Sequence, residues 1–186
     1  MMGFSLAEEA QRRGAKVILI AGTTHLVPPY GVKFIPVNTT TEMREAVLSS
    51  LSPDSVLIMT AAVADFRPKE KAKEKIKKEG KGELTLKLIP TPDILAEIGE
   101  KGLGRLRVGF AAETEDIVGK ARKKLSRKNL DLIIANDVSS SEAGFSSPFI
   151  LPVIIEREGK IHRFPRIRKE EFARRLINII EERLNR

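Results

Sequence analysis

Residues 55–68 read SVLIMTAAVADFRP, and this stretch indicates the fold class. An apolar run from Ser55 to Met59 ends in small residues and a single acid, Asp65. This is the pattern of a buried parallel strand whose carboxyl end faces a ligand. A basic segment follows, because residues 67–81 contain eight Lys or Arg against three Glu, a net +5. The stretch therefore predicts an α/β sheet with an anion-binding edge.

Strand and helix patterns alternate along most of the chain. Apolar or alternating runs predict strands at 16–21, 33–37, 55–59, 83–89, 106–112, 131–135, 150–156 and 160–164. Amphipathic runs predict helices at 4–13, 41–51, 92–101, 115–128 and 169–184. We expect a doubly wound, mainly parallel sheet with an appended carboxyl-terminal β-hairpin and a closing helix.

Composition limits the class of protein. The chain has 186 residues, of which 41% are hydrophobic, so we expect one domain over residues 1–186. It has no cysteine, which excludes disulfides, thiolate metal sites and thiol nucleophiles. No apolar run approaches the roughly 18 to 20 residues of a membrane span, and the amino terminus does not resemble a signal peptide. We therefore expect a cytoplasmic protein.

The positive charge is local. The formal net charge is +8, and residues 120–128 add six further Lys or Arg without an acid. A nucleic-acid-binding protein usually spreads such charge over a broad face with aromatic side chains for stacking, and here aromatic residues are 5% with no Trp. Two focused clusters favour a polyanionic small molecule, so we expect no nucleic-acid partner.

Residues 66–82 are expected to form a mobile lid, because Pro68 and two glycines flank the lysine-rich run. A lysine on such a lid can close over a triphosphate and neutralise the charge that develops when pyrophosphate leaves. The alternative is a solvated, charge-balanced loop. The pattern alone does not choose among seven lysines, Lys69, Lys71, Lys73, Lys75, Lys77, Lys78 and Lys81.

Other candidates lie at strand ends and on one helix. Asp65 suits a magnesium ligand near phosphates or an acceptor for a hydroxyl or amino group, and the alternative is a helix or turn cap for the next segment. Lys120, Lys124 and Lys128 are spaced i, i+4 and i+8, so they form one helical stripe whose mutual repulsion an anion would relieve, unless solvent screens it. Phe110 either stacks on a base or fills the core.

Five ordered segments, AAVADFRP, EKIKK, TPDIL, VGFAAET and NLDLIIANDVS, resemble phosphopantothenate–cysteine ligase, the carboxyl-terminal half of the bifunctional coenzyme A biosynthesis protein. The resemblance implies a Rossmann-like fold, a homodimer and a fused or separate phosphopantothenoylcysteine decarboxylase. It also implies that CTP, with Mg²⁺, activates 4′-phosphopantothenate as an acyl-cytidylate, which cysteine then attacks through its amine. A non-catalytic nucleotide-binding or regulatory module is the alternative.

The resemblance also assigns roles to individual positions. Lys75 corresponds to the lid lysine that helps to form the acyl-cytidylate, and Asp65 to a residue that contacts CTP or its metal. The residues that correspond to the CTP pocket are Met59, Thr60, Ala61, Asp65, Pro92, Asp93, Ile94, Leu95, Phe110, Lys124 and Lys128.

One part of the family pattern is not found in the sequence. Family members precede the first helix with a strand and a glycine-serine phosphate turn, and Met2-Gly3 corresponds to the end of that segment. The strand would lie near the centre of the sheet. We therefore expect a chain that begins at Met1 to retain much of the CTP pocket but to be less stable and impaired or inactive as a ligase, unless another chain or a longer natural product supplies the segment.

Overall fold

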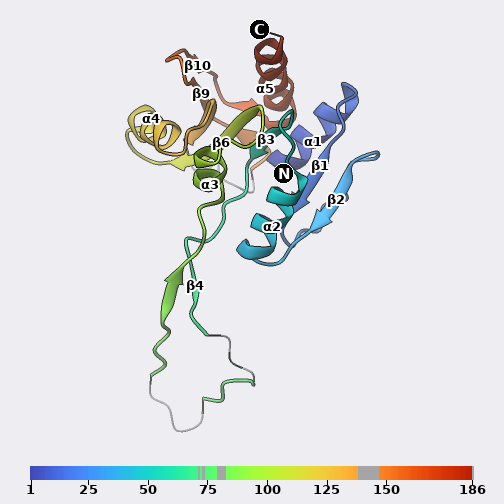
Figure 1. Ribbon diagram of the computed structural model, residues 1–186. Coiled ribbons are helices and arrows are strands. Elements are labelled where there is room, and N and C mark those ends of the chain that lie inside the picture. The colour runs from blue at the N-terminus through green and yellow to red at the C-terminus, as the bar shows by residue number, and fades with distance from the viewer. Residues whose placement is uncertain (71, 73, 79–82, 138–146, 186) are drawn as a thin grey trace.

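The computed structural model describes residues 1–185 except 71, 73, 79–82 and 138–146. Its centre is a five-stranded sheet in the order β10-β9-β7-β6-β3 (Figure 1). Strands β3 (Val56–Met59), β6 (Leu106–Glu113) and β7 (Leu132–Asp137) are parallel. Strands β9 (Pro152–Glu156) and β10 (Ile161–Arg163) form the predicted hairpin and extend the sheet in the antiparallel direction.

Helices cover both faces of this sheet, which confirms the doubly wound α/β class. On one face, α1 (Met2–Arg12) and α5 (Lys169–Leu184) pack on an apolar cluster from β6, β7 and β9. On the other face, α3 (Ile94–Glu100) and α4 (Ile117–Arg127) contribute to two further apolar clusters. The α5 cluster includes Phe172 and Leu176, both with no exposed surface.

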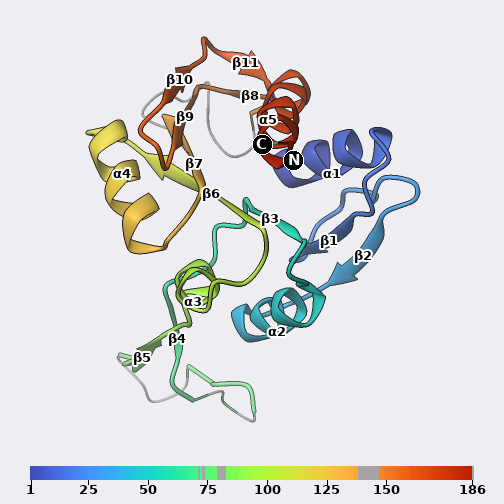
Figure 2. The same ribbon diagram turned by 45° about the horizontal axis from the view of Figure 1, so that its top comes forward.

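Strands β1 (Ile18–Ala21) and β2 (Lys33–Pro36) form a separate parallel pair. Helix α2 (Thr40–Ser50) begins after Thr39, whose side chain accepts a hydrogen bond from the Glu42 amide. Figure 2 shows that the β1–β2 pair lies next to the β3 edge of the central sheet, on the side away from β6. A cavity of about 810 Å³ lies between the two sheets and is lined by residues of β1, β3, α1, α2 and α5.

The described residues of the segment 66–90 form a long arm that projects away from the sheet (Figure 1). At its base, β4 (Phe66–Pro68) pairs with β5 (Leu88–Pro90) in antiparallel register, and the Lys69 amide donates to the Lys87 carbonyl over 2.8 Å. The predicted strand at 83–89 is wrong in extent, since only residues 88–90 are a strand. No neighbouring sheet buries its alternating side chains, so the pattern alone does not produce a longer ladder.

The remaining elements are short. Strands β8 (Phe149–Ile150) and β11 (Ile167–Arg168) form an antiparallel pair that leads into α5. Helix α3 begins at Ile94 and not, as predicted, at residue 92, because Asp93 is the N-cap. The described part of the predicted lid, residues 66–70, 72 and 74–78, lies in the arm, and the remaining lid positions, 71, 73 and 79–82, are outside the described residues. Among the described helices, none is long and apolar enough to cross a membrane.

Candidate functional site

The carboxyl ends of β3 and β6 bring several of the predicted pocket residues together. Met59 is paired in register with Gly109, the residue before Phe110. A Cβ on Gly109 would lie 2.7 Å from Leu130 Cδ1 and 3.2 Å from Leu95 Cδ1, so the glycine allows the beginning of α3 to pack directly on β6. The segment from Met59 and the beginning of α3 therefore meet at one edge of the sheet.

The opposite end of α3 packs on the turn that follows α4. A Cβ on Gly99 would lie 2.0 Å from the carbonyl oxygen of Lys128, a distance that no side chain could occupy. The Asn129 side-chain amide donates to the Gly99 carbonyl over 2.8 Å, and Asn129 itself has a positive φ of 49°. This close contact fixes Lys128 beside α3.

Lys128 forms an ion pair with Asp93, another predicted pocket residue. The Lys128 Nζ lies 3.0 Å from Asp93 Oδ1, and the same carboxylate accepts the Ala96 amide at the N-cap of α3. Burial raises the pKa of Asp93, but the hydrogen bonds from Lys128 and Ala96 outweigh it, and the pKa is lowered overall. Asp93 thus remains ionised at neutral pH and orients the lysine.

Lys124 forms a second pair, with the buried carboxylate of Glu113. The Lys124 Nζ lies 2.7 Å from Glu113 Oε1, and the Glu113 side chain is 8% exposed. Two carboxylates of the protein itself therefore relieve the repulsion along the lysine stripe. The sequence had suggested relief by a bound anion or by solvent, and neither prediction included these carboxylates. Lys120, the third member of the stripe, is exposed.

Asp65 lies at the base of the arm, with an exposed side chain. Its carbonyl accepts the Thr91 amide over 2.9 Å, which closes the β4–β5 ladder. Across the described residues, no three His, Cys, Asp or Glu side chains are close enough to share a metal ion. A single exposed carboxylate fits a Mg²⁺ ion that is already coordinated by phosphates, which usually takes only one or two protein carboxylates.

The structure does not bring every predicted residue to this edge. Lys75 is exposed in the arm, which points away from α3 and α4 (Figure 1). Phe110 is half-buried and packs against the apolar cluster under α5, so core filling accounts for at least part of its side chain. Among the pocket residues, Ile94 and Leu95 are buried, whereas Ala61 and Pro92 are exposed.

The beginning of α1 lies against the end of β3. A Cβ on Gly3 would lie 2.9 Å from Thr60 Oγ1, so a larger residue would displace the Thr60 side chain. Thr60, Ala61 and Gly3 all line the cavity between β1 and β3. This edge of the site therefore opens directly into the cavity.

Sequence reasoning missed two residues that shape the site. Glu113 belongs to the quoted segment VGFAAET, but its role as the partner of Lys124 depends on the packing of α4 on β6. The role of Gly99 carried little signal in the sequence, because its contact joins positions 29 residues apart in the chain. A glycine on the buried side of a helix was the only available clue.

Comparison with known proteins places these features in a family. The profile described as DNA/pantothenate metabolism flavoprotein C-terminal domain matches residues 1–184. The chain is 50% identical over 165 residues to the coenzyme A biosynthesis bifunctional protein CoaBC of Bacillus subtilis, covering 88% of this chain and 40% of that protein. The Vibrio cholerae protein of the same name is 41% identical over 185 residues, or 98% of this chain and 46% of the relative. The chain thus spans less than half the length of these relatives.

A solved structure agrees with the sequence matches. The crystal structure of the C-terminal domain of a CoaBC protein superposes with a TM-score of 0.83 at 35% identity. The match covers 99% of this chain and 82% of that one. The expected Rossmann-like fold is confirmed.

Proposed function

Because the chain belongs to the DNA/pantothenate metabolism flavoprotein C-terminal domain family, we propose that it is a ligase domain that joins 4′-phosphopantothenate to cysteine at the expense of CTP. The observation that carries this proposal is the match along the whole chain to proteins of coenzyme A biosynthesis. The cationic groups beside α3 and β6 support it, because a triphosphate needs such groups.

In the proposed reaction, a carboxylate oxygen of 4′-phosphopantothenate attacks the α-phosphorus of CTP and pyrophosphate leaves. The amine of cysteine then attacks the acyl carbon of the acyl-cytidylate, and CMP leaves. Lys124 and Lys128 would bind phosphate oxygens, and their positive charge would offset the negative charge that accumulates in the transition state. Mg²⁺ bound with Asp65 would supply further charge neutralisation.

Lys75 is proposed to act from the arm. The arm points away from α3 and α4, so Lys75 can reach the phosphates only if the arm moves toward these helices (Figure 1). Such closure would also exclude water from the acyl-cytidylate, a mixed anhydride that hydrolyses easily. The lysine would then stabilise the leaving pyrophosphate.

Thermal shift with CTP or ATP, each with and without Mg²⁺, tests the nucleotide part. At one hundred times its dissociation constant, CTP should stabilise the fold by about 2.7 kcal/mol, or roughly 5 to 10 °C for a chain of this size. No shift with CTP, or a larger shift with ATP, would overturn the choice of nucleotide.

Pyrophosphate release in the presence of 4′-phosphopantothenate and cysteine tests the chemistry. Lys75→Ala should lower kcat by at least about ten-fold with little change in fold stability, since it removes charge stabilisation from the transition state. Lys77→Ala is the matched control, because it removes an exposed lysine from the same segment. Equal losses in both variants would refute a specific role for Lys75.

A non-catalytic nucleotide-binding module is the second candidate. The observation in its favour is the break between β1 and β3, which leaves a cavity where a continuous sheet would support the pocket. This alternative would be supported if CTP raises the melting temperature but no pyrophosphate is released in the presence of CTP, 4′-phosphopantothenate and cysteine.

We also propose which second enzyme accompanies the domain, in which compartment it works and how it assembles. The relatives are named as bifunctional proteins and are more than twice as long as this chain. A fused or separate phosphopantothenoylcysteine decarboxylase would supply the second function, and both would work in the cytoplasm. We further propose a homodimer, for which the arm offers exposed leucines.

A further inference from the structure

We propose that Glu113 is a positioning residue, which holds the ammonium group of Lys124 in place for the nucleotide phosphates. This inference rests on the proposed function, since it assumes that Lys124 binds phosphate. The observation behind it is the 2.7 Å contact between Lys124 Nζ and a carboxylate that is almost completely buried at the end of β6.

The packing of α4 on the sheet creates this contact. Ala111 and Glu113 lie on the same side of β6 and are both buried. Ala121 and Leu125 of α4 pack in the apolar cluster on this face, and Lys124 lies between them in sequence. The aliphatic part of Lys124 can therefore follow the helix–sheet boundary while its ammonium group reaches the strand end.

The burial of Glu113 makes the pair persistent. An ionised carboxylate that is removed from water is costly unless a cation compensates it. In the described part of the chain, Lys124 is the cation that pairs with Glu113. Lys124 therefore stays beside Glu113 when no ligand is bound, whereas Lys120 on the same stripe is exposed.

This arrangement leaves the lysine able to bind phosphate. An ammonium group has three donors, and the contact with Glu113 uses one of them. The Lys124 side chain is 39% exposed, so solvent or a ligand can reach the remaining donors. Because the long side chain is already ordered, nucleotide binding does not lose that conformational entropy a second time.

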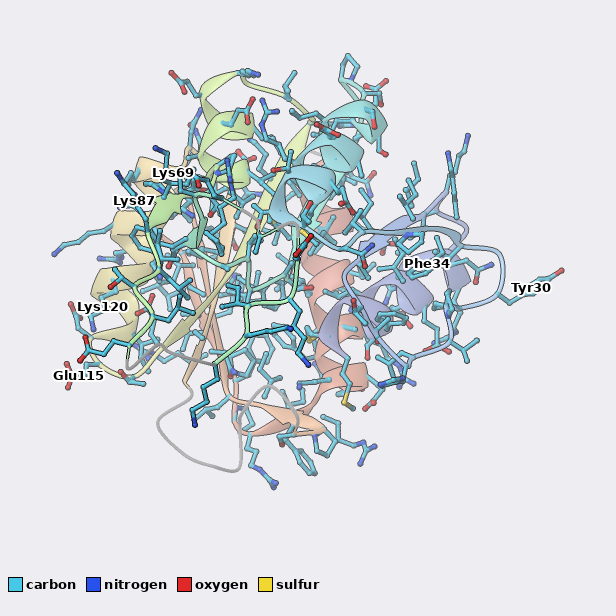
Figure 3. The ribbon with its side chains drawn as sticks, turned by 90° about the horizontal axis from the view of Figure 1, so that it is seen from below. Tyr30, Phe34, Lys69, Lys87, Glu115 and Lys120 are labelled. Carbon is cyan, nitrogen blue, oxygen red and sulfur yellow. The ribbon has the colours of Figure 1, made fainter. Side chains whose placement is uncertain are left out.

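The test compares Glu113→Gln with Glu115→Gln. Glu115 lies two residues after the end of β6 and is exposed. Glu115→Gln therefore removes the same charge near the site but leaves the ion pairs of Lys124 and Lys128 intact. Figure 3 shows Glu115 and Lys120 at the outer edge of the molecule. Circular dichroism and melting temperature establish that both variants are folded.

The first measurement is lysine acetylation, read by peptide mass spectrometry without nucleotide. In the wild-type chain, Lys124 should react about three- to ten-fold more slowly than Lys120, and Glu113→Gln should remove that difference while Glu115→Gln preserves it. Equal reaction rates of Lys124 and Lys120 in the wild-type chain would overturn the inference.

The second measurement is the affinity for CTP with Mg²⁺. Glu113→Gln should weaken binding by about three- to ten-fold although it removes a negative charge, and Glu115→Gln should leave it equal or slightly tighter. Adding Glu113→Gln to Lys124→Met should cause no further loss, because the carboxylate acts through the lysine. Tighter binding by Glu113→Gln would overturn the inference. A wild-type chain that protects Lys124 but binds no CTP would instead overturn the proposed function.

Discussion

Glu97, on α3, is held by cations from two directions. Arg44 of α2 donates to both of its carboxylate oxygens, and Lys101 donates from the end of α3. The hydrogen bonds from Arg44 and then Lys101 lower the pKa of Glu97 to about 2. The contact ties α2, which follows the separate β1–β2 pair, to the helix that carries Asp93.

This pKa predicts how stability depends on pH. The folded-state pKa lies below the ordinary value of 4.5, so the stabilising contribution is complete above pH 4.5 and is lost as the pH falls toward 2. Glu97→Gln should lower the denaturation midpoint at pH 7. It should also make the midpoint fall less steeply between pH 4.5 and pH 2 than it does in the wild-type chain. Glu100→Gln, an exposed change on the same helix, should behave as wild type, and an unchanged pH profile in Glu97→Gln would contradict the prediction.

Gly99 is the residue on which the position of Lys128 depends. Gly99→Ala would place a methyl group 2.0 Å from a backbone oxygen, so α3 must move away from the end of α4. We expect a loss of about 1 to 3 kcal/mol in the free energy of unfolding, as for other overpacked sites. Urea denaturation measures it.

Gly22→Ala is the matched control for this prediction. Its Cβ would meet the Val37 carbonyl at 3.9 Å, an ordinary contact, and the structure gives Gly22 no strained φ. A Gly99→Ala chain as stable as Gly22→Ala would show that the α3–α4 contact is looser than described.

At the scale of elements, the arm separates two kinds of side chain. Its first half carries lysines, and its second half carries Leu84, Leu86 and Leu88, which are 56%, 60% and 52% exposed. Alternate residues of an extended segment share one side, so these leucines form an apolar stripe. Such a stripe is costly in water, and it is the surface on which the proposed homodimer can be tested.

The dimer proposal can be tested on this stripe. Leu84→Ser with Leu86→Ser should weaken self-association by at least about ten-fold, because each change removes roughly 1.5 kcal/mol or more of apolar burial. Sedimentation velocity over a range of concentrations measures it. Ile76→Ser, at another exposed apolar residue of the arm, is the control, and equal effects of both changes would argue against the leucine stripe as the interface.

At the scale of the whole molecule, two strands have open edges that face a shared cavity. Within the described strands, β1 pairs with β2 and β3 pairs with β6. The cavity between them is lined largely by apolar residues, including Leu19, Ile20, Leu57 and Ile58. A strand placed there would satisfy both edges and join the two sheets into one.

This geometry predicts the effect of an added strand. Compared with residues 1–186 alone, a chain that carries the corresponding strand and turn ahead of α1 should melt at least about 5 °C higher, because several apolar side chains would be buried and two ladders completed. It should also release pyrophosphate faster, because the phosphate turn would complete the pocket. Differential scanning calorimetry and the turnover assay measure these effects, and equal melting and turnover by both chains would refute the prediction.

Local sequence pattern determined most of the elements but not their limits. The closing helix at 169–184 has the predicted bounds because its apolar residues recur at helical spacing and pack on one face. The strand at 83–89 was overestimated for the opposite reason, since residues 83–87 are exposed and belong to no described strand. Periodicity indicates which side of an element could be buried, whereas packing decides whether it is buried.

The sequence by itself determined the doubly wound class, the hairpin, and the cationic character of the α4 stripe. It could not determine which lysines are held, because that depends on Glu113 and Asp93, which lie 11 and 35 residues away along the chain. Only the tertiary structure decided that Lys124 and Lys128 are paired with carboxylates and that the arm carries Lys75 away from them. The physical reason is that charge is a property of a residue, whereas burial and pairing arise only when distant segments pack together.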